Sequence, residues 1–374
     1  MFVALAGYLI AYRINQSAVV GIILAGIIVG PSVLGLITYT DLVETLAHLG
    51  AVVLLFTIGL EFKIGDILKL RYFVIALVGI IVPALGGYFL ASGFGYDFKA
   101  SIFVGTALTA TSIAITANVL QEMGKLKTDT AKAIIGAAVI DDVLALLALS
   151  VSEGIVSGEV SVISLVVTTA KATGFIVLGV IIGKLLLSRL IIGLDKTKIA
   201  EKYPESVFIF AIMVAFFYGM AAEYVGLSAI VGSFLAGASF AGVKLTRGHI
   251  FREGAEHLQI IFASIFFVSL GVIMDLHAIT MGVLWFVLAL TVVAMLTKVI
   301  GCGVPALFQR MSLRDSLTVG IGMVPRGEVA MIVALIGLTQ NLIDQPTYSA
   351  IVLMSLLTTI IPPLVLRNWI FKKA

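Results

Sequence analysis

The sequence is poor in charged residues and almost free of cysteine. Of its 374 residues, 12% are Asp, Glu, Lys or Arg and 60% are hydrophobic, whereas a typical soluble domain is about a quarter charged. So few charges cannot cover the surface of a protein of this size in water, which excludes a soluble globular chain. The one cysteine, Cys302, excludes an intrachain disulfide.

What the sequence has in abundance is long apolar segments. About 20 apolar residues in a helix cross the hydrocarbon core of a bilayer. We therefore expect an all-α polytopic membrane protein with about thirteen transmembrane helices, the first of them short, surrounded by membrane lipid and not by nucleic acid. The thirteen candidate segments are Phe2–Tyr12, Ala18–Val33, Leu42–Leu60, Tyr72–Ala91, Ala100–Leu120, Thr130–Val151, Ile163–Leu187, Val207–Ala222, Leu227–Ala241, Leu258–Met274, Thr280–Phe308, Ser316–Leu338 and Tyr348–Leu366.

The loops between these segments alternate in charge. One set of alternate loops holds 19 of the 24 Lys and Arg residues, and the opposite set holds only Lys99. The positive-inside rule places the basic loops in the cytoplasm. It predicts a multi-pass protein of the cell (inner or plasma) membrane with a cytoplasmic C-terminus and, if the first segment spans, an N-terminus outside.

Asp141 and Asp142 stand side by side in the middle of the apolar segment from Thr130 to Val151. An Asp at the centre of a membrane helix costs roughly 2.5–3.5 kcal/mol on insertion scales, so two in succession indicate a function. The structural alternative, an Asp pair that caps a soluble helix, needs a polar flank within one turn, and there is none. Consecutive helical side chains diverge by about 100°, so the two carboxylates cannot face the same partner.

Lys298 is the obvious cation for one of these carboxylates, because it lies deep inside the segment from Thr280 to Phe308. A buried carboxylate and a buried ammonium offset each other's desolvation, so the sequence predicts an ion pair. The other carboxylate is then expected to face a water-filled cavity, where it can exchange H⁺ for a hard monovalent cation.

Two of the apolar segments are interrupted near their middle, one at Thr109–Ser112 and the other at Pro325–Gly327. Pro325 removes a backbone donor, so we expect a break at mid-membrane. The two breaks fall in the fifth and twelfth segments. They occupy the fifth place of each half when the seventh segment is taken as a linker. An odd linker inverts the second half, so the pattern predicts two inverted repeats with crossing discontinuous helices, the arrangement of a transporter's binding site.

The first break also supplies candidate ligands. A hard monovalent cation takes oxygen from carboxylates, hydroxyls, unwound backbone and water. Thr109, Ala110, Thr111 and Ser112 are therefore candidate ion-binding residues beside the Asp pair. We expect no cofactor; the ion itself is substrate.

Arg326 and Glu328, at the second break, have two interpretations. In the first they are supporting charges, with Glu328 neutralising a helix N-terminus or a nearby charge and Arg326 facing C-terminal carbonyls. In the second, either residue coordinates the ion. Glu61, at the cytoplasmic end of its segment, is expected to line an interface or gate.

Three motifs resemble a known family. Gly26-Ile27-Ile28-Val29-Gly30-Pro31 and Leu54-Leu55-Phe56-Thr57-Ile58-Gly59-Leu60-Glu61 are similar to the early helices of the second branch of the monovalent cation/proton antiporters. Ala138-Val139-Ile140-Asp141-Asp142 resembles the double-aspartate subset of that branch, the NapA-like Na⁺/H⁺ antiporters. The similarity extends over essentially the whole chain.

The resemblance implies an NhaA/NapA-like fold in which a core domain moves vertically against a dimerisation domain, an elevator type of alternating access, within a homodimer. The implied units within the single transmembrane antiporter unit 1–374 are a dimerisation-type subdomain at about 1–61 and 207–274, a core ion-transport subdomain at about 71–153 and 280–368, and a linker helix at 163–190.

The resemblance also assigns roles to the site. It implies that Asp141 bridges to Lys298 and that Asp142 is the main ion and proton carrier, with Na⁺ at Asp142 and with Asp141 and Thr111 as further candidate ligands. An Asp pair with a lysine marks electrogenic exchangers in this family, which move more than one H⁺ per cation. The expected activity is exchange of Na⁺ or Li⁺ for H⁺, in the service of pH homeostasis.

The same family contains KefC-type K⁺ efflux proteins, which carry Gln-Asp where this chain has Asp141-Asp142. That departure favours Na⁺ over K⁺ and leaves a K⁺/H⁺ antiporter or K⁺ efflux protein as the alternative. KefC-type proteins append a cytoplasmic nucleotide-binding domain. This sequence ends shortly after its last apolar segment, so no C-terminal regulatory domain is expected.

Other classes of membrane protein fit less well. A bile-acid-type Na⁺ symporter needs a pocket for an organic anion, and an Asp pair has the wrong sign for it. An intramembrane aspartyl protease needs carboxylates that converge from two helices on one water, whereas adjacent residues diverge. A purely structural or receptor protein would leave the cost of the deep charges without compensation. We therefore expect a secondary active transporter and not an enzyme.

Overall fold

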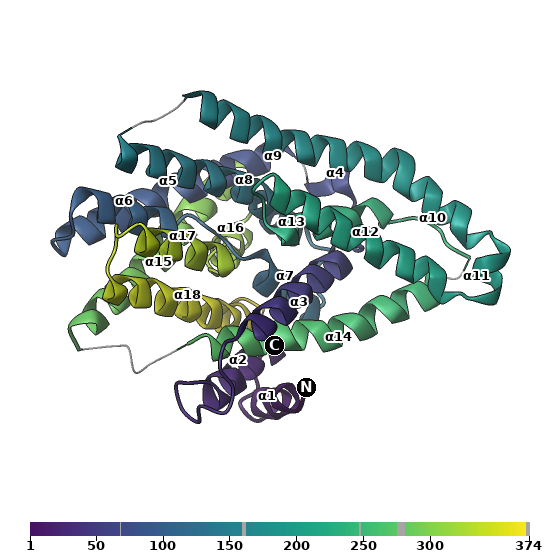
Figure 1. The fold of residues 1–374 in the computed structure, drawn as a ribbon, viewed down its shortest axis with the longest axis horizontal. Helices are drawn as coiled ribbons and strands as arrows, with labels where there is room; N and C mark the ends of the chain where they lie inside the picture. The colour runs from purple at the N-terminus through teal and green to yellow at the C-terminus, as the bar shows by residue number, and fades with distance from the viewer. Residues whose placement is uncertain (68, 159–161, 247, 275–280, 372–374) are drawn as a thin grey trace.

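The computed structural model describes residues 1–374 apart from 68, 159–161, 247, 275–280 and 372–374 (Figure 1). Regular structure in these described residues is entirely helical, which confirms the all-α class. The elements are α1 (Phe2–Arg13), α2 (Ala18–Val29), α3 (Asp41–Gly59), α4 (Ile64–Ile67), α5 (Leu70–Gly93), α6 (Phe98–Ala107), α7 (Ile113–Glu122), α8 (Asp129–Ser157), α9 (Val162–Ile182), the π-helical turn η1 (Gly183–Leu187), α10 (Ser188–Asp195), α11 (Lys198–Lys202), α12 (Glu205–Tyr224), α13 (Ala229–Phe240), α14 (Gly248–Val272), α15 (Met281–Phe308), α16 (Leu313–Gly322), α17 (Glu328–Thr339), α18 (Gln345–Val365) and the π-helical turn η3 (Leu366–Ile370).

Within the described residues, eight helices are long enough and apolar enough to cross a bilayer. They are α3, α5, α8, the continuous α9–α10, α12, α14, α15 and α18. The other five predicted segments are helical but either short (α1, α2, α13) or interrupted (α6/α7, α16/α17). A helix of 12 residues is ~18 Å long, which is less than the hydrocarbon thickness. The number of thirteen crossings therefore remains a prediction.

Six helices pack together into what we call the scaffold group: α1, α2, α3, α12, α13 and α14. Glycine allows the close contacts between them. Gly237 of α13 lies directly on the carbonyl of Phe56 in α3, and Gly271 of α14 lies on the carbonyl of Ile23 in α2, so a Cβ at either position would collide with backbone. Small residues at helix crossings are a common way to bring membrane helices together.

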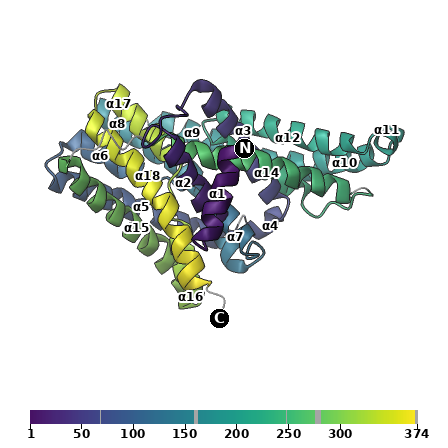
Figure 2. The same ribbon diagram turned by 90° about the horizontal axis from the view of Figure 1, so that it is seen from below.

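A second set of helices, which we call the ion-pair group, consists of α5 to α8 and α15 to α18. Its most extensive contact joins α5 to α15, where Cys302 packs directly on Gly79. In Figure 1 most of this group lies on the left, while α12 and α14 of the scaffold group extend to the right, and the view turned by 90° in Figure 2 shows the same separation. α7 lies at the boundary, because it also contacts α2 and α3.

The two predicted helix interruptions are confirmed. α6 ends at Ala107 and α7 begins at Ile113, while α16 ends at Gly322 and α17 begins at Glu328. In the first break the Thr109 hydroxyl donates to the carbonyl of Thr106 at 2.7 Å. Such local bonds offer the backbone an alternative to the helical ladder. The two breaks meet, because the Ser112 N–H donates to the Pro325 carbonyl at 2.8 Å.

The segment predicted to be a linker forms one long helical rod, α9–η1–α10, from Val162 to Asp195. It lies against the scaffold group: the Tyr218 hydroxyl donates to the Gly179 carbonyl at 2.9 Å and the Ser188 hydroxyl to the Ser239 carbonyl at 2.8 Å. The π-helical turn begins at Gly183, where a Cβ would collide with the Ser239 hydroxyl. The rod follows α8 in the chain and packs along it, so it joins the two groups.

Candidate functional site

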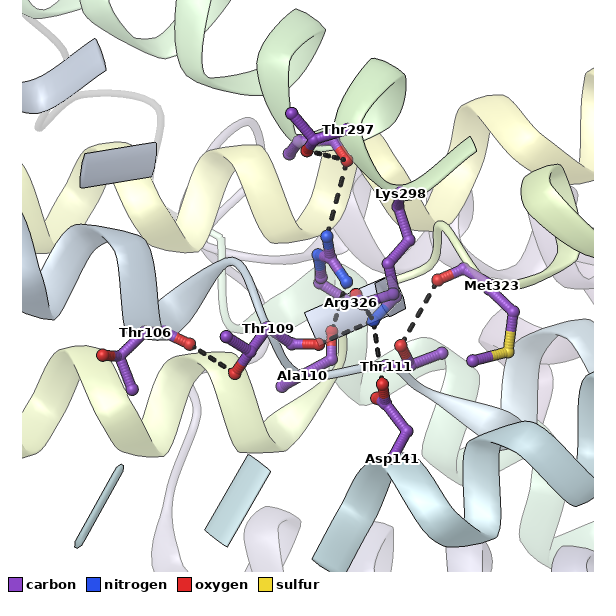
Figure 3. Close-up of polar contacts among 11 residues, drawn as sticks. Thr106, Thr109, Ala110, Thr111, Asp141, Thr297, Lys298, Met323 and Arg326 are labelled. Carbon is purple, nitrogen blue, oxygen red and sulfur yellow. Dashed lines mark hydrogen bonds and ion pairs between the residues drawn. The ribbon is translucent and has the colours of Figure 1, made fainter. Parts of the chain in front are cut away.

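The centre of the ion-pair group holds a buried ion pair. The Lys298 ammonium, on α15, lies 3.0 Å from the Asp141 carboxylate on α8, and the two side chains are 0% and 1% exposed (Figure 3). Breaking such a pair would leave one charge buried and uncompensated. The structure therefore brings together Asp141 and Lys298, two residues 157 positions apart.

Lys298 has two further partners, both of them carbonyls. Its ammonium donates to Gly79 of α5 and to Thr109 in the first break, each at 2.8 Å. An ammonium has three donors, so all three are used. The Lys298 side chain, which belongs to α15, therefore contacts α5, α8 and the first break at the same time. Sequence reasoning missed Gly79, because a backbone carbonyl leaves no signal in the residue type.

Arg326 also points at the first break (Figure 3). It is fully buried, and its guanidinium donates to the carbonyl of Ala110 and, at 3.4 Å, to that of Ala294. The Thr359 hydroxyl fixes the Arg326 backbone by donating to its carbonyl at 2.8 Å. The Ala110 carbonyl lies in the break shortly after α6 ends, whereas the Ala294 carbonyl lies inside α15. Glu328 begins α17, and its side chain lies outside the described part of the structure.

The first break is therefore lined with carbonyls that face protein cations. The carbonyls of Thr109 and Ala110 accept from Lys298 and Arg326, and the Thr111 hydroxyl donates to the carbonyl of Met323 at 3.3 Å. Thr111 is partly exposed, whereas the Ser112 hydroxyl is buried and makes no hydrogen bond with the described residues. In this described break the hydroxyl oxygens of Thr111 and Ser112 accept no hydrogen bond from Lys298 or Arg326, so these two oxygens are the candidates for binding an ion.

Asp142 points in another direction from Asp141. It is partly exposed, and its carboxylate accepts the backbone N–H of Ser228 at 3.0 Å. Ser228 is the N-cap of α13, and the N-terminus of a helix favours a negative charge. The two consecutive carboxylates are therefore divided between the groups: Asp141 faces into the ion-pair group and Asp142 meets the scaffold group.

A further set of polar contacts joins the two groups near one end of the molecule. The Glu122 carboxylate, at the end of α7, accepts the Ser17 hydroxyl at 2.6 Å and the Ala18 N–H at 3.2 Å, so it caps α2. Gln259 of α14 donates to Gln121 at 2.8 Å. An acidic residue in the last turn of a helix opposes the helix dipole. This unfavourable position is the only feature of the sequence that marks Glu122, and it does not show which residues Glu122 contacts.

Glu61, expected to line an interface or gate, lies among these contacts. Its carboxylate is 2.9 Å from Lys127 and 4.0 Å from Arg252. It also lines a cavity of about 70 Å³, and Glu122 lines a second cavity of about 330 Å³. Gln121 and Glu256 line both cavities, which lie where the two groups face each other.

Replacing Lys298 tests whether the buried pair holds the ion-pair group together. Lys298→Ala leaves Asp141 buried without its cation, and we expect a loss of about 3–5 kcal/mol in the free energy of unfolding, measured as a lower melting temperature in detergent. Lys184→Ala is the matched control, because Lys184 lies on an exposed helix face and is expected to leave the melting temperature unchanged. Equal melting temperatures for the two variants would contradict this account.

Known proteins resemble this chain along its whole length. The family model described as the transmembrane sodium/hydrogen exchanger matches residues 1–372. The chain is 33% identical over 366 residues to the Na⁺/H⁺-K⁺ antiporter GerN of Bacillus cereus, covering 97% of this chain and 92% of GerN. It is 34% identical over 372 residues to a Na⁺/H⁺ antiporter of Enterococcus hirae, covering 96% and 93%.

Solved structures add a likeness in fold. The sodium proton antiporter MjNhaP1 from Methanocaldococcus jannaschii superposes with a TM-score of 0.75 at 16% identity, covering 98% of this chain and 94% of that chain. The two broken helices that meet through Ser112 and Arg326 agree with the family match over residues 1–372. The chain belongs to the sodium/hydrogen exchanger family of transmembrane monovalent cation/proton antiporters.

Proposed function

We propose that this protein exchanges Na⁺ or Li⁺ for H⁺ across a membrane, with Asp142 as the carrier of both ions. The observation that carries the proposal is the division of the Asp pair: Asp141 is neutralised by Lys298 at 3.0 Å, while Asp142 is partly exposed at the boundary between the two groups. A partly exposed carboxylate at such a boundary can hold either a proton or a monovalent cation. The names of GerN and of the Enterococcus hirae relative support the same activity.

In the proposed mechanism the bound Na⁺ rests on Asp142 with the Thr111 hydroxyl as a further ligand, and Asp141 becomes a ligand only by turning its side chain away from Lys298. Ser112 has a buried hydroxyl without a partner among the described residues and completes the set. When Asp141 turns to the ion, Lys298 loses its carboxylate and releases a proton in addition to the one that leaves Asp142. More than one H⁺ then moves per Na⁺, so the exchange is electrogenic.

We further propose that the two helix groups are the moving parts. The ion-pair group corresponds to a core subdomain at about 71–153 and 280–368, and the scaffold group to a dimerisation-type subdomain at about 1–61 and 207–274, with the linker helix at about 163–190. The core carries the ion in an elevator-type movement within a homodimer, and the basic loops and the C-terminus face the cytoplasm. The polar contacts of Asp142 and Glu122 with the scaffold group must break during each cycle.

A K⁺/H⁺ antiporter of the same family is the second candidate. The observation in its favour is the name of GerN, a Na⁺/H⁺-K⁺ antiporter, at 33% identity over 366 residues. The Asp141–Asp142 pair favours Na⁺ by its resemblance to the NapA-like branch. A protease is not proposed, because the family consists of transporters and the two carboxylates point to different partners.

Asp142→Asn removes the proposed carrier. We expect it to abolish Na⁺- and Li⁺-driven dissipation of a pH gradient in proteoliposomes, because an amide can neither release a proton nor offer a carboxylate to the ion. Asp129→Asn, on the same helix, is the matched control: its side chain is 84% exposed beside Lys132, so transport should be unchanged. Full activity of Asp142→Asn would refute the assignment.

The choice of ion and the charge balance can be measured together. Purified protein in proteoliposomes is given Na⁺, Li⁺, K⁺ or Rb⁺ at several pH values, with and without valinomycin. We expect Na⁺ and Li⁺ to drive H⁺ flux and valinomycin with K⁺ to accelerate it, because net charge moves. Flux driven by K⁺ and Rb⁺ would favour the second candidate, and no effect of valinomycin would exclude electrogenic exchange.

The relative movement can be tested by crosslinking in a Cys302→Ser background. Gln121 and Gln259 join the two groups at 2.8 Å, so Gln121→Cys with Gln259→Cys and a short reducible crosslinker should arrest exchange until the link is reduced. His48→Cys with Glu223→Cys is the matched pair, since these residues lie 3.2 Å apart within the scaffold group. This second link should leave transport intact. Arrest by neither link, or by both, would speak against the proposed movement.

A further inference from the structure

A groove on the outside of the ion-pair group takes no part in the proposed ion exchange. It has a volume of about 540 Å³ and lies between the first turns of α5 and the end of α15. Its lining is apolar except for Arg71 and Gln309, and includes Val74 from α5 and Val304 from α15. Both helices are candidate membrane spans, so the groove lies where a span meets the headgroup region.

The closest backbone approach of the two helices lies near their middle. There, Gly301 of α15 lies so near α5 that a Cβ would come within 2.9 Å of the Val78 carbonyl, and Gly86 of α5 lies directly on Thr297. Beyond Gly301 the facing residues are larger, and Val304 is 43% exposed. Pro305 also stands inside α15, a residue that bends helices.

Arg71 stands at the edge of the groove and brings a positive charge to a mostly apolar lining. Arg71 donates to the Tyr72 hydroxyl at 2.8 Å, and its guanidinium carbon lies 4.8 Å from the centre of the Tyr72 ring. Among the described ion pairs none uses Arg71. Gln309 donates to the Arg71 carbonyl at 2.8 Å, which leaves its own carbonyl oxygen buried and without a partner among the described residues. A guanidinium in a fixed orientation suits a phosphate.

We propose that this groove binds an anionic phospholipid, with one acyl chain between α5 and α15 and the phosphate on Arg71. The apolar lining matches the chain, and the charge of Arg71 matches the headgroup. Lys69 and Arg310, which flank Arg71 and Gln309 in the sequence, add to the positive potential.

A lipid in this groove would also affect the Asp141–Lys298 ion pair. α15 carries Lys298, and α5 supplies the Gly79 carbonyl that accepts from it at 2.8 Å. A chain that fills the groove holds the ends of these two helices at a fixed separation. The lipid therefore stabilises the pair of helices on which the Lys298 site is built. This inference does not depend on which ion is transported.

The test uses the full chain, purified in a mild detergent, with phosphatidylglycerol and phosphatidylcholine of identical acyl chains. Bound lipid is counted by native mass spectrometry and the melting temperature is followed in parallel. We expect phosphatidylglycerol to be retained about fivefold better, the effect of about one basic residue near an anionic headgroup. Arg71→Gln should remove this preference, and Val304→Phe, which fills the groove, should reduce the binding of both lipids.

Two control variants test whether the effects are specific to the groove. Arg189→Gln removes an exposed arginine outside the groove, and Val292→Phe enlarges a 54% exposed valine elsewhere on α15. Both should behave like the unmodified chain. Val74→Phe fills the groove from α5 if Val304→Phe does not fold. Equal retention of the two lipids, or unchanged retention in Arg71→Gln and in the groove-filling variants, would overturn the proposal. So would a groove-filling variant that changes only the oligomer mass, because the occupant would then be a second copy of the chain.

Discussion

The structure depends most on the need to satisfy one buried ammonium. Lys298 lies where water is excluded, and an unpaired charge there would cost several kcal/mol. Three acceptors from three different segments meet it: the Asp141 carboxylate and the carbonyls of Gly79 and Thr109. Two of these are backbone groups, and one is free to accept only because α6 stops at Ala107. The break in the helix supplies an acceptor for the buried lysine, and the lysine satisfies a carbonyl that the break leaves without a helical partner.

Arg326 repeats the same solution from the other break. Its guanidinium donates to the Ala110 carbonyl, and the preceding residue, Pro325, accepts the Ser112 N–H with its carbonyl. Unwound backbone at membrane depth is tolerated only where protein or water satisfies it. In this protein two buried cations satisfy part of the unwound backbone, because Lys298 donates to the Thr109 carbonyl and Arg326 to the Ala110 carbonyl.

The sequence determined much of the fold because the bilayer is a demanding solvent. Backbone groups in lipid must be satisfied within the segment, so a long apolar run is a helix. Each of the thirteen predicted segments contains helix, and the two interruptions lie at Thr109–Ser112 and Pro325–Gly327 as expected. The divergence of Asp141 and Asp142 also follows from the sequence alone, because helical geometry separates consecutive side chains.

Other features were decided only by the tertiary structure, because they depend on which distant segments meet. Nothing in the residue type of Gly79 shows that its carbonyl accepts from Lys298, 219 positions away. Nor does the sequence show that Glu122 caps α2 through Ser17, or that Asp142 accepts from the backbone of Ser228. The sequence determined which charges lie in the membrane, because their cost marks them. The packing of helices far apart in the chain decided their partners, because backbone carbonyls and N–H groups are the same in every residue.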